Sequence, residues 1–411
     1  MRLALPPRRV GEHGGPGAGR STRRQRDDDR PNGDAVTLRT ALMAHPSAEL
    51  YGSDRVFLES VIALAESGWR VVVALPGDGP LAEAIREQGA EVVYCPTPVL
   101  RKSALRPSGF IRLLGDFARS VVPTVRLLRS TRADVVYVNT VTVPTWLLLA
   151  RLTRHAVIAH VHEAEEAAAP AVRAALCAPL LAATTVVVNS EATAAATTRP
   201  LPRLRRRIRL VYNGVPGPEG EQGAPRAPHD PVRLVLVGRL SPRKGTDVAV
   251  RAVARLRARG RAVALDLVGS VFTGYEWYQR ELQDLVREHD LGDVVGFHGF
   301  QTDVWDALRE ADIALVPSRF EPFGNTSVEA QLAGTPVIVT DAQGLPETVA
   351  HGEFGAVVPA GDPDALAAAI SGALDDWEKT VRTAEQAREH ARERFAPQRY
   401  RREIAEIAAR P

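Results

Sequence analysis

A chain of 411 residues is too long for one ordinary hydrophobic core, so its length predicts two domains. Its 45% hydrophobic and 25% charged residues are typical of a soluble globular protein, and a net charge of +3 is too small for this size to indicate nucleic-acid binding. No stretch approaches the roughly 20 apolar residues that span a bilayer. The sequence therefore predicts a cytoplasmic protein, with attachment to a membrane surface as the alternative.

Cysteine spacing and the N-terminal composition support the same prediction. Cys95 and Cys177 show neither metal-ligand nor redox spacing, which favours reduced thiols in a cytosolic protein. Residues 1–35 are rich in Arg, Gly, Pro and Asp, without hydrophobic periodicity or the apolar segment of a signal peptide. We expect these residues to form a disordered tail.

Strand and helix patterns alternate from Leu38 onward. Helices are predicted at 55–67 and 81–88. The short apolar runs that predict strands in the first half are 38–44, 69–75, 91–94, 135–138, 156–161, 185–189 and 208–212. Such alternation is typical of a parallel sheet with right-handed crossovers.

Residues 98–132 mix apolar side chains with arginines. A basic amphipathic helix of this kind binds an anionic membrane surface in some proteins. The same pattern also fits a helix packed on the sheet, with its arginines in water, and both interpretations stay open.

The Pro- and Gly-rich residues 216–231 are predicted to be a linker, after which the alternation restarts. The second set of predicted strands is 233–237, 265–268, 294–297, 313–316, 337–340 and 356–358. The predicted fold class is α/β, with two doubly wound parallel-sheet domains, 36–215 and 232–395, facing a ligand cleft. The charged, amphipathic residues 396–411 are expected to form a helix that packs back on the first domain.

Two carboxylates bracket a Pro-Phe-Gly turn in the stretch PSRFEPFGNTSVEAQLAGTPVIVTDAQGLPE, residues 317–347. Glu321 follows a predicted strand, and Glu329 lies in the opening turns of the next helix. Ligands of open α/β sheets bind beyond the carboxyl ends of the strands, where a helix N-terminus favours phosphate. The pattern suits a phosphorylated, hydroxyl-rich ligand such as a nucleotide sugar. Taken alone, the two glutamates fit surface or helix-capping positions equally well.

The loop GRLSPRKG, residues 238–245, places Arg239 and Lys244 between a strand and a helix. A guanidinium fork and a compact ammonium suit the two phosphates of a diphosphate. The glycine spacing is neither that of a Walker loop nor that of a dinucleotide fingerprint. Thr246 or Asp247 is expected to cap the helix. The alternative, a solvated turn, is weakened because Lys244 is one of only three lysines in the chain.

GRLSPRKG, then FHGF, then the 317–347 stretch closely resemble the nucleotide-sugar domain of family 4 retaining glycosyltransferases. The resemblance extends from about Leu38 and is weaker in the N-terminal half. It implies the GT-B architecture, in which 36–215 is the acceptor-side domain and 232–395 binds the nucleotide sugar. One departure is Gln343 before Gly344, where the family often has a second glycine.

The resemblance also implies roles for residues of the 232–395 domain. Arg239 and Lys244 would bind the donor diphosphate, Glu329 would accept from the ribose hydroxyls, and Glu321 would hold the donor sugar near the reacting face. The backbone amides of Phe323, Gly324 and Asn325 would meet the phosphates or the sugar.

In the first domain, His162 of HVHE resembles the family histidine that contacts the transferred sugar, while His160 is interpreted as structural. His298, in the second domain, is also interpreted as structural. Gly52 and Ser53 resemble the glycine loop beneath the phosphates. Asp-x-Asp occurs only within 27–29 and at 362–364, and neither match is placed like a metal clamp, so no metal is implied. No cofactor is implied beyond the nucleotide diphosphate sugar as co-substrate.

The predicted function is transfer of a hexose-type sugar to a hydroxyl acceptor with retention of configuration, in polysaccharide, glycolipid or cell-envelope glycan biosynthesis. The expected partners are the sugar donor, a glycan or lipid-linked acceptor, and a peripheral contact at the inner membrane face, without nucleic acid. Two alternatives stay open: a nucleotide-sugar epimerase or phosphorylase on the same fold, and a non-catalytic relative that binds sugar nucleotides.

Overall fold

The computed structural model describes residues 38–411, apart from 51, 101–106, 165–167, 219–226 and 273. The predicted N-terminal tail and the middle of the predicted linker lie outside the described residues.

The first sheet has seven parallel strands in the order β3-β2-β1-β4-β5-β6-β7. Its strands are β1 (Thr40–Ala44), β2 (Arg70–Leu75), β3 (Glu91–Tyr94), β4 (Val135–Asn139), β5 (Ala156–Val161), β6 (Thr185–Val188) and β7 (Ile208–Leu210). Side chains alternate along β1, so Met43 enters one hydrophobic core and Leu42 enters the core on the other face. Burial on both faces explains the continuous apolar runs that predicted these strands.

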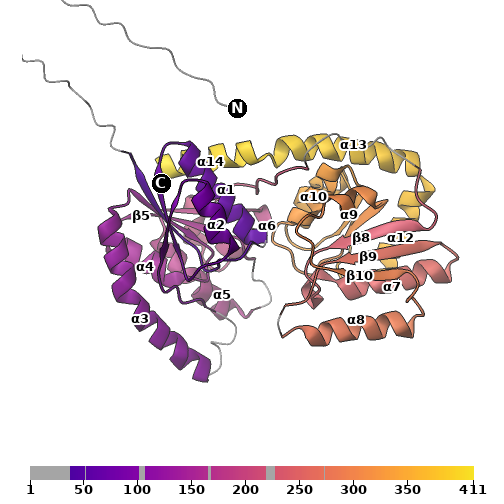
Figure 1. Ribbon diagram of the computed structural model, residues 1–411, viewed down its shortest axis with the longest axis horizontal. Coiled ribbons are helices and arrows are strands. Elements are labelled where there is room, and N and C mark those ends of the chain that lie inside the picture. Colours follow the sequence, from indigo (N-terminus) through magenta and orange to yellow (C-terminus); the bar gives the residue numbers. More distant parts are fainter. Residues whose placement is uncertain (1–37, 51, 101–106, 165–167, 219–226, 273) are drawn as a thin grey trace, which may run out of the picture. The chain divides into compact units, whose positions relative to one another are not determined.

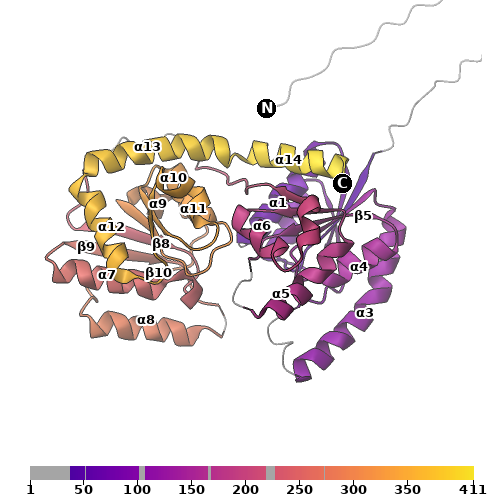
Figure 2. The same ribbon diagram turned by 180° about the vertical axis from the view of Figure 1, so that it is seen from behind.

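Helices cover both faces of the first sheet (Figures 1 and 2). Their bounds are α1 (Gly52–Glu66), α2 (Pro80–Glu87), α3 (Pro107–Thr131), α4 (Pro144–Leu152), α5 (Pro170–Cys177) and α6 (Glu191–Thr198). Sequence reasoning did not predict α4, α5 and α6. The first two begin with a proline in their first turn, a start signal that could have located them.

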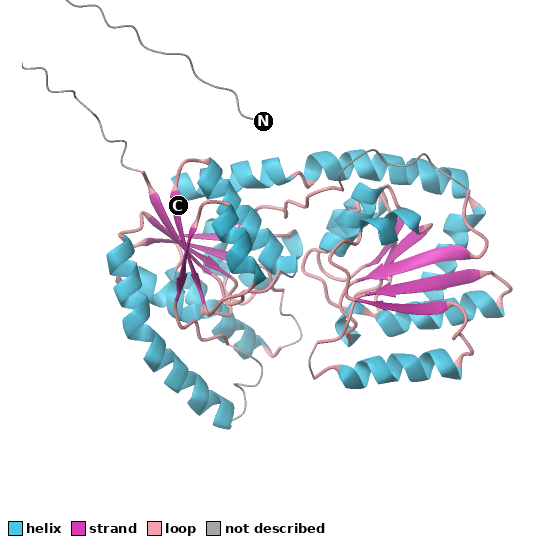
Figure 3. Cartoon of the chain, viewed as in Figure 1, coloured by secondary structure: helices cyan, strands magenta, loops and turns pink. Residues whose placement is uncertain are grey.

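The second sheet has six parallel strands in the order β10-β9-β8-β11-β12-β13. Figure 3 shows strands of this sheet as magenta arrows with cyan helices around them. Its strands are β8 (Val232–Val237), β9 (Val263–Val268), β10 (Val295–Gly299), β11 (Ile313–Val316), β12 (Val337–Thr340) and β13 (Ala356–Val358). Its helices are α7 (Thr246–Ala258), α8 (Glu276–Glu288), α9 (Trp305–Glu310), α10 (Asn325–Ala333), α11 (Leu345–Thr348) and α12 (Pro363–Asp375). The prediction of an α/β fold with two parallel sheets is confirmed.

The predicted side-chain cap of α7 is wrong. The cap position is Gly245, with φ of 67° and no capping side chain. A Cβ on this residue would lie 1.9 Å from the carbonyl oxygen of Pro317, so only glycine lets the β8–α7 loop approach the end of β11 this closely.

The C-terminal segment forms α13 (Trp377–Arg394) and α14 (Pro397–Ala409). Tyr400, Ile404 and Ala408 of α14 are buried in the same core as Val56 and Phe57 of α1. The contact also has a polar part, because Arg401 pairs with Glu59 at 2.7 Å. Residues 397–409 therefore complete a core of the first sheet.

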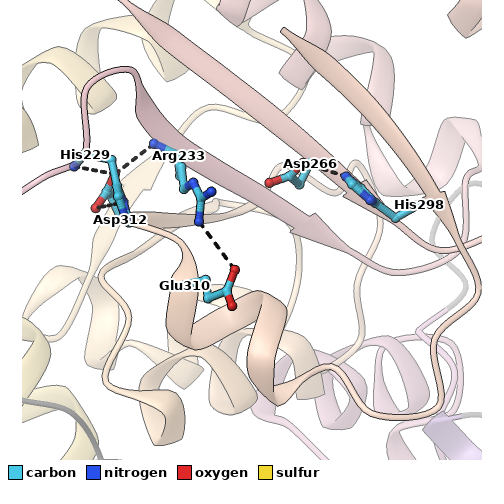
Figure 4. Close-up of polar contacts among 6 residues, drawn as sticks. All are labelled: His229, Arg233, Asp266, His298, Glu310 and Asp312. Carbon is cyan, nitrogen blue, oxygen red and sulfur yellow. Dashed lines mark hydrogen bonds and ion pairs between the residues drawn. The ribbon is translucent and has the colours of Figure 1, made fainter.

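A buried carboxylate fixes the chain where it enters the second sheet (Figure 4). Asp312 accepts hydrogen bonds from the backbone amides of His229 and Arg233, at 3.1 and 2.8 Å, and also bonds the His229 ring. Figure 4 also shows His298, which pairs with Asp266 at 2.6 Å on neighbouring strands. Both of these side chains are more than two-fifths exposed, which suits the structural interpretation of His298.

Candidate functional site

Lys244 and Glu321 form an ion pair beyond the carboxyl ends of β8 and β11. The Lys244 Nζ lies 2.5 Å from Glu321 Oε2, and the Glu321 side chain is 11% exposed. Arg243 approaches the other carboxylate oxygen at 3.9 Å. Burial opposes ionisation of Glu321, but the two cations hold its pKa below the ordinary value. Glu321 is therefore a carboxylate in the folded protein.

Arg319, which sequence reasoning missed, holds the loop that carries Lys244. Its guanidinium donates to both carboxylate oxygens of Asp247 at 2.7 Å and to the carbonyl oxygen of Pro242 at 2.8 Å. Its backbone amide donates to the carbonyl oxygen of Arg243. Sequence reasoning could have identified Arg319 because it lies in the same motif as Glu321. A bidentate fork of this kind fixes geometry as well as charge.

Arg239 lies at the other end of the same loop, with its guanidinium 3.4 Å from the ring centroid of Phe272. A Cβ on Gly238 would lie 3.7 Å from Cε of Lys244, so the lysine side chain folds back toward the end of β8. The loop thus directs a planar and a compact cation to one edge of the sheet.

The N-terminus of α10 lies at the same edge of the second sheet as Arg239 and Lys244. Within the described residues, the backbone amides of Phe323, Gly324 and Asn325 donate to no protein acceptor. The turn requires glycine, because Gly324 has φ of 110°. The Phe323 side chain is buried in a small core with Tyr212 and Phe395, so only its backbone can face a ligand. Three unused donors at a helix N-terminus suit an anion.

The start of α1 lies beside this helix terminus. A Cβ on Gly52 would lie 3.8 Å from Nδ2 of Asn325, whose Oδ1 accepts from Asn213 Nδ2 at 2.9 Å. Ser53 is exposed, one residue into α1. The structure therefore brings Gly52 and Asn325 together, as it does Lys244 and Glu321.

Glu329 is a partly exposed carboxylate on α10 that forms no hydrogen bond or ion pair with any described residue. Burial raises its pKa, and the positive charges of Arg55 and Lys244 oppose that rise only in part. A carboxylate with unused acceptor oxygens suits ligand hydroxyls.

His162 belongs to a hydrogen-bonded chain at the carboxyl ends of β1, β4 and β5, and no described contact joins it to Lys244 or Glu321. Its Nε2 lies 2.8 Å from Asn139 Oδ1, and Asn139 Nδ2 lies 2.9 Å from His45 Nδ1. His45 Nε2 lies 2.8 Å from Asp54 Oδ1. His160 is fully buried, with its ring centroid 4.0 Å from that of His162.

Gln343 and Glu347 form contacts with residues of the first half. Gln343 has φ of 51°, a left-handed conformation that explains why glycine suits this position, and its side-chain amide donates to the carbonyl oxygen of Ala164 at 2.6 Å. Glu347 accepts from the amides of Glu191 and Ala192 at the start of α6, at 2.8 and 3.0 Å.

The described residues contain no group of three His, Cys, Asp or Glu side chains placed to hold a metal ion. Within the same ranges, no helix combines the length and apolarity required to cross a lipid bilayer.

Solved structures share this fold. A structure of Anabaena Alr3699/HepE in complex with UDP has a TM-score of 0.75 at 23% identity, covering 90% of this chain and 100% of that one. WaaG, a glycosyltransferase involved in lipopolysaccharide biosynthesis, has a TM-score of 0.66 at 18% identity, covering 90% and 100%. At these identities the likeness is one of fold, and that fold is the GT-B architecture.

Family models identify the relationship more closely. The model described as glycosyl transferases group 1 matches residues 220–390, and the model described as glycosyltransferase family 4 matches residues 51–217. The chain belongs to the group 1 glycosyltransferases of family 4 type.

Curated relatives match part of the chain. Glycogen synthase of Mycobacterium tuberculosis is 34% identical over 184 residues, which are 44% of this chain and 43% of the relative. A D-inositol 3-phosphate glycosyltransferase of Catenulispora acidiphila is 39% identical over 170 residues, 40% of each chain. The match thus spans about two-fifths of each relative's length.

Proposed function

We propose that this protein transfers a hexose-type sugar from a nucleotide diphosphate donor to a hydroxyl acceptor, with retention of anomeric configuration. The observation that carries the proposal is the buried Lys244–Glu321 pair beside three unused amides at the start of α10. Cations and a helix N-terminus match a diphosphate, and the carboxylates of Glu321 and Glu329 match the hydroxyls of a sugar and a ribose.

In this proposal the donor site needs no metal ion. Arg239, Lys244 and the α10 amides stabilise the negative charge that develops on the leaving diphosphate. Glu321 holds the donor sugar and His162 contacts it from the first domain. The acceptor hydroxyl attacks the face that the diphosphate leaves, and the departing phosphate oxygen takes its proton. No protein nucleophile is required.

Thermal-shift measurements against a panel of nucleotide sugars test the donor assignment. UDP-glucose belongs in the panel, because a structure of Anabaena Alr3699/HepE was solved in complex with it. A ligand that binds only the folded state stabilises it by about 2.7 kcal/mol at a hundred times its Kd. Lys244→Ala is expected to abolish the shift, whereas Lys379→Ala, a matched control at an exposed site on α13, should preserve it.

The stabilising donor is then incubated with candidate glycan and lipid-linked acceptors, with and without EDTA. Transfer with retained configuration and no loss in EDTA supports the proposal. Release of epimerised sugar or sugar phosphate without an acceptor would instead assign an epimerase or phosphorylase. Donor binding without turnover would assign a non-catalytic relative.

We further propose that α3 contacts the inner face of a membrane, where a lipid-linked acceptor would be found. Its exposed apolar side chains Ile111, Leu114 and Val122 recur at helical spacing, and Arg112, Arg119 and Arg126 recur every seven residues. This combination suits an anionic surface. Ile111→Ser with Leu114→Ser should reduce binding to vesicles containing phosphatidylglycerol. Leu152→Ser, at an exposed apolar site on α4, should not reduce it.

A further inference from the structure

Four polar side chains from separate elements of the first half form one continuous hydrogen-bonded chain. It runs from Asp54 on α1 to His45 after β1, then to Asn139 at the end of β4 and His162 after β5. The first three are 3%, 2% and 0% exposed. Their positions are also fixed by packing, since the His45 ring stacks on Phe57 at 4.4 Å. Water therefore has little access to the links between them.

The chemistry of the four groups fixes the direction of the hydrogen bonds. An ionised Asp54 can only accept, so His45 Nε2 carries the proton that it donates. A neutral His45 then has a lone pair on Nδ1, which faces the Asn139 amide nitrogen, a donor. The carbonyl oxygen of the same amide is left to face His162, so His162 must donate from Nε2.

Burial keeps the end of the chain neutral. It lowers the pKa of His162 to about 3, with a further lowering by His45 and an opposing effect of Asp54. Burial likewise places the pKa of the adjacent His160 well below its ordinary value. A neutral imidazole with a proton on Nε2 has an unprotonated Nδ1.

The Nδ1 atom of His162 has no hydrogen-bond partner among the described residues, and the side chain is partly exposed. We propose that Asp54, His45 and Asn139 are positioning residues that hold His162 as the Nε2–H tautomer, so that Nδ1 accepts a hydrogen bond from a sugar hydroxyl. The identity of that hydroxyl group rests on the proposed function, whereas the tautomer does not.

Nitrogen-15 NMR of histidine-labelled full-length protein at pH 7.5 tests the tautomer directly. The signals of His162 are assigned from their loss in His162→Gln. We expect a protonated Nε2 and an unprotonated Nδ1 for both His45 and His162. A protonated Nδ1 on His162, alone or together with Nε2, would overturn the proposal.

Asp54→Asn tests whether the side chain at position 54 controls the tautomer of His162 through the hydrogen-bonded chain. The side chain keeps its shape but gains a donor, so His45 is no longer forced to donate from Nε2. The His162 signals should then become those of a tautomer mixture, three hydrogen bonds away from the substitution. Tyr137→Phe is the matched control: it removes a buried hydroxyl 2.5 Å from His160 Nδ1 but leaves the four-residue chain intact. Unchanged His162 signals in Asp54→Asn would refute the positioning role.

Kinetics with donor analogues connect the tautomer to the substrate. At one sugar position, both the deoxy and the fluoro analogue should lower kcat/KM about three- to tenfold, the range for one lost hydrogen bond. Fluorine accepts but cannot donate, so equal losses identify an acceptor on the protein. The same loss should become smaller in Asp54→Asn but keep its full size in Tyr137→Phe. If the fluoro analogue matches the parent sugar at every position, His162 does not accept from the donor.

A failure of donor binding can be separated from a failure of this inference. The NMR experiment needs no ligand, so the expected tautomer in a protein that binds no nucleotide sugar would refute only the proposed function.

Discussion

The ammonium of Lys244 lies 2.5 Å from the carboxylate of Glu321, and the two side chains are 19% and 11% exposed. Lys244 is therefore the main counter-ion of a carboxylate whose ionisation burial opposes. Under the proposed function, a donor phosphate would bind beside a lysine that already has a partner. Under that proposal, the same ion pair affects both the stability of the protein and its affinity for the donor.

Removing one member of this pair should cost more stability than removing both. Lys244→Met leaves a buried carboxylate with Arg243 at 3.9 Å, and we expect a loss of about 1–3 kcal/mol in the free energy of unfolding. Lys244→Met combined with Glu321→Gln should recover most of that loss without restoring activity. Urea denaturation of the two variants measures the difference. A double variant less stable than the single one would show that the ion pair itself is strongly stabilising.

Glu329→Gln should stabilise the protein while it weakens donor binding. Burial raises the pKa of Glu329, so ionisation at neutral pH has a free-energy cost that an amide avoids. The gain should be larger at pH 8 than at pH 5, because the glutamate is ionised at the higher pH. Differential scanning calorimetry should show an increase in Tm on the order of 1–3 °C at pH 8. An equal increase at both pH values would exclude charge burial as the cause.

Gly344→Ala should disrupt the site through a steric clash, without any backbone strain. The residue has an ordinary negative φ, but its Cβ would lie 2.1 Å from the carbonyl oxygen of Pro322 and 3.0 Å from Cβ of Ser190. We expect a loss of about 2 kcal/mol or more in stability, together with reduced activity.

Gly372→Ala provides the control for that substitution. Gly372 lies inside α12, and a Cβ there meets no atom within 4 Å. This variant should gain about 0.5–1 kcal/mol, since alanine is the better helix former. Equal effects of the two substitutions would contradict the contact argument.

Acid should destabilise the protein through His162. The pKa of His162 is about 3 in the folded state and near 6.5 in the unfolded chain, so only the unfolded state binds a proton between these values. The free energy of unfolding should therefore decrease as the pH is lowered below about 6.5. This residue contributes at most ~1.4 kcal/mol to that decrease per pH unit.

The comparison of wild type with His162→Gln isolates this contribution. Between pH 7 and pH 5 the variant should lose less stability than the wild type, as measured by urea denaturation. Parallel pH profiles would mean that His162 can be protonated in the folded protein.

Local sequence signals predicted the strands well, because both faces of each parallel sheet are buried and the strands are continuously apolar. Local signals failed where the structure depends on contacts between residues that are far apart in the sequence. The start of α7 depends on the approach of Pro317 to Gly245, and Asp247 binds Arg319 instead of capping the helix. A capping pattern in the sequence cannot show either contact.

The residues of the candidate site likewise differ in how well the sequence could predict them. Lys244 and Glu321 each occur within a compact motif, and their partnership follows from the order β8-β11 in the sheet. His45 and Asn139 are 94 residues apart and carry no local motif. Their contact arises only because β1 and β4 are neighbours and both end at the same edge.

The packing of α14 on α1 has a consequence for how the protein is made. Tyr400 and Ile404 belong to the core that also holds Phe57 and Val61, more than 300 positions earlier in the chain. During translation the first sheet emerges from the ribosome long before α14 does, with that part of its core still open to solvent. The first sheet therefore lacks part of its core until the residues of α14 have also been synthesised. Chaperone binding to ribosome-stalled chains should accordingly decline only when stalling allows residues near 408 to emerge.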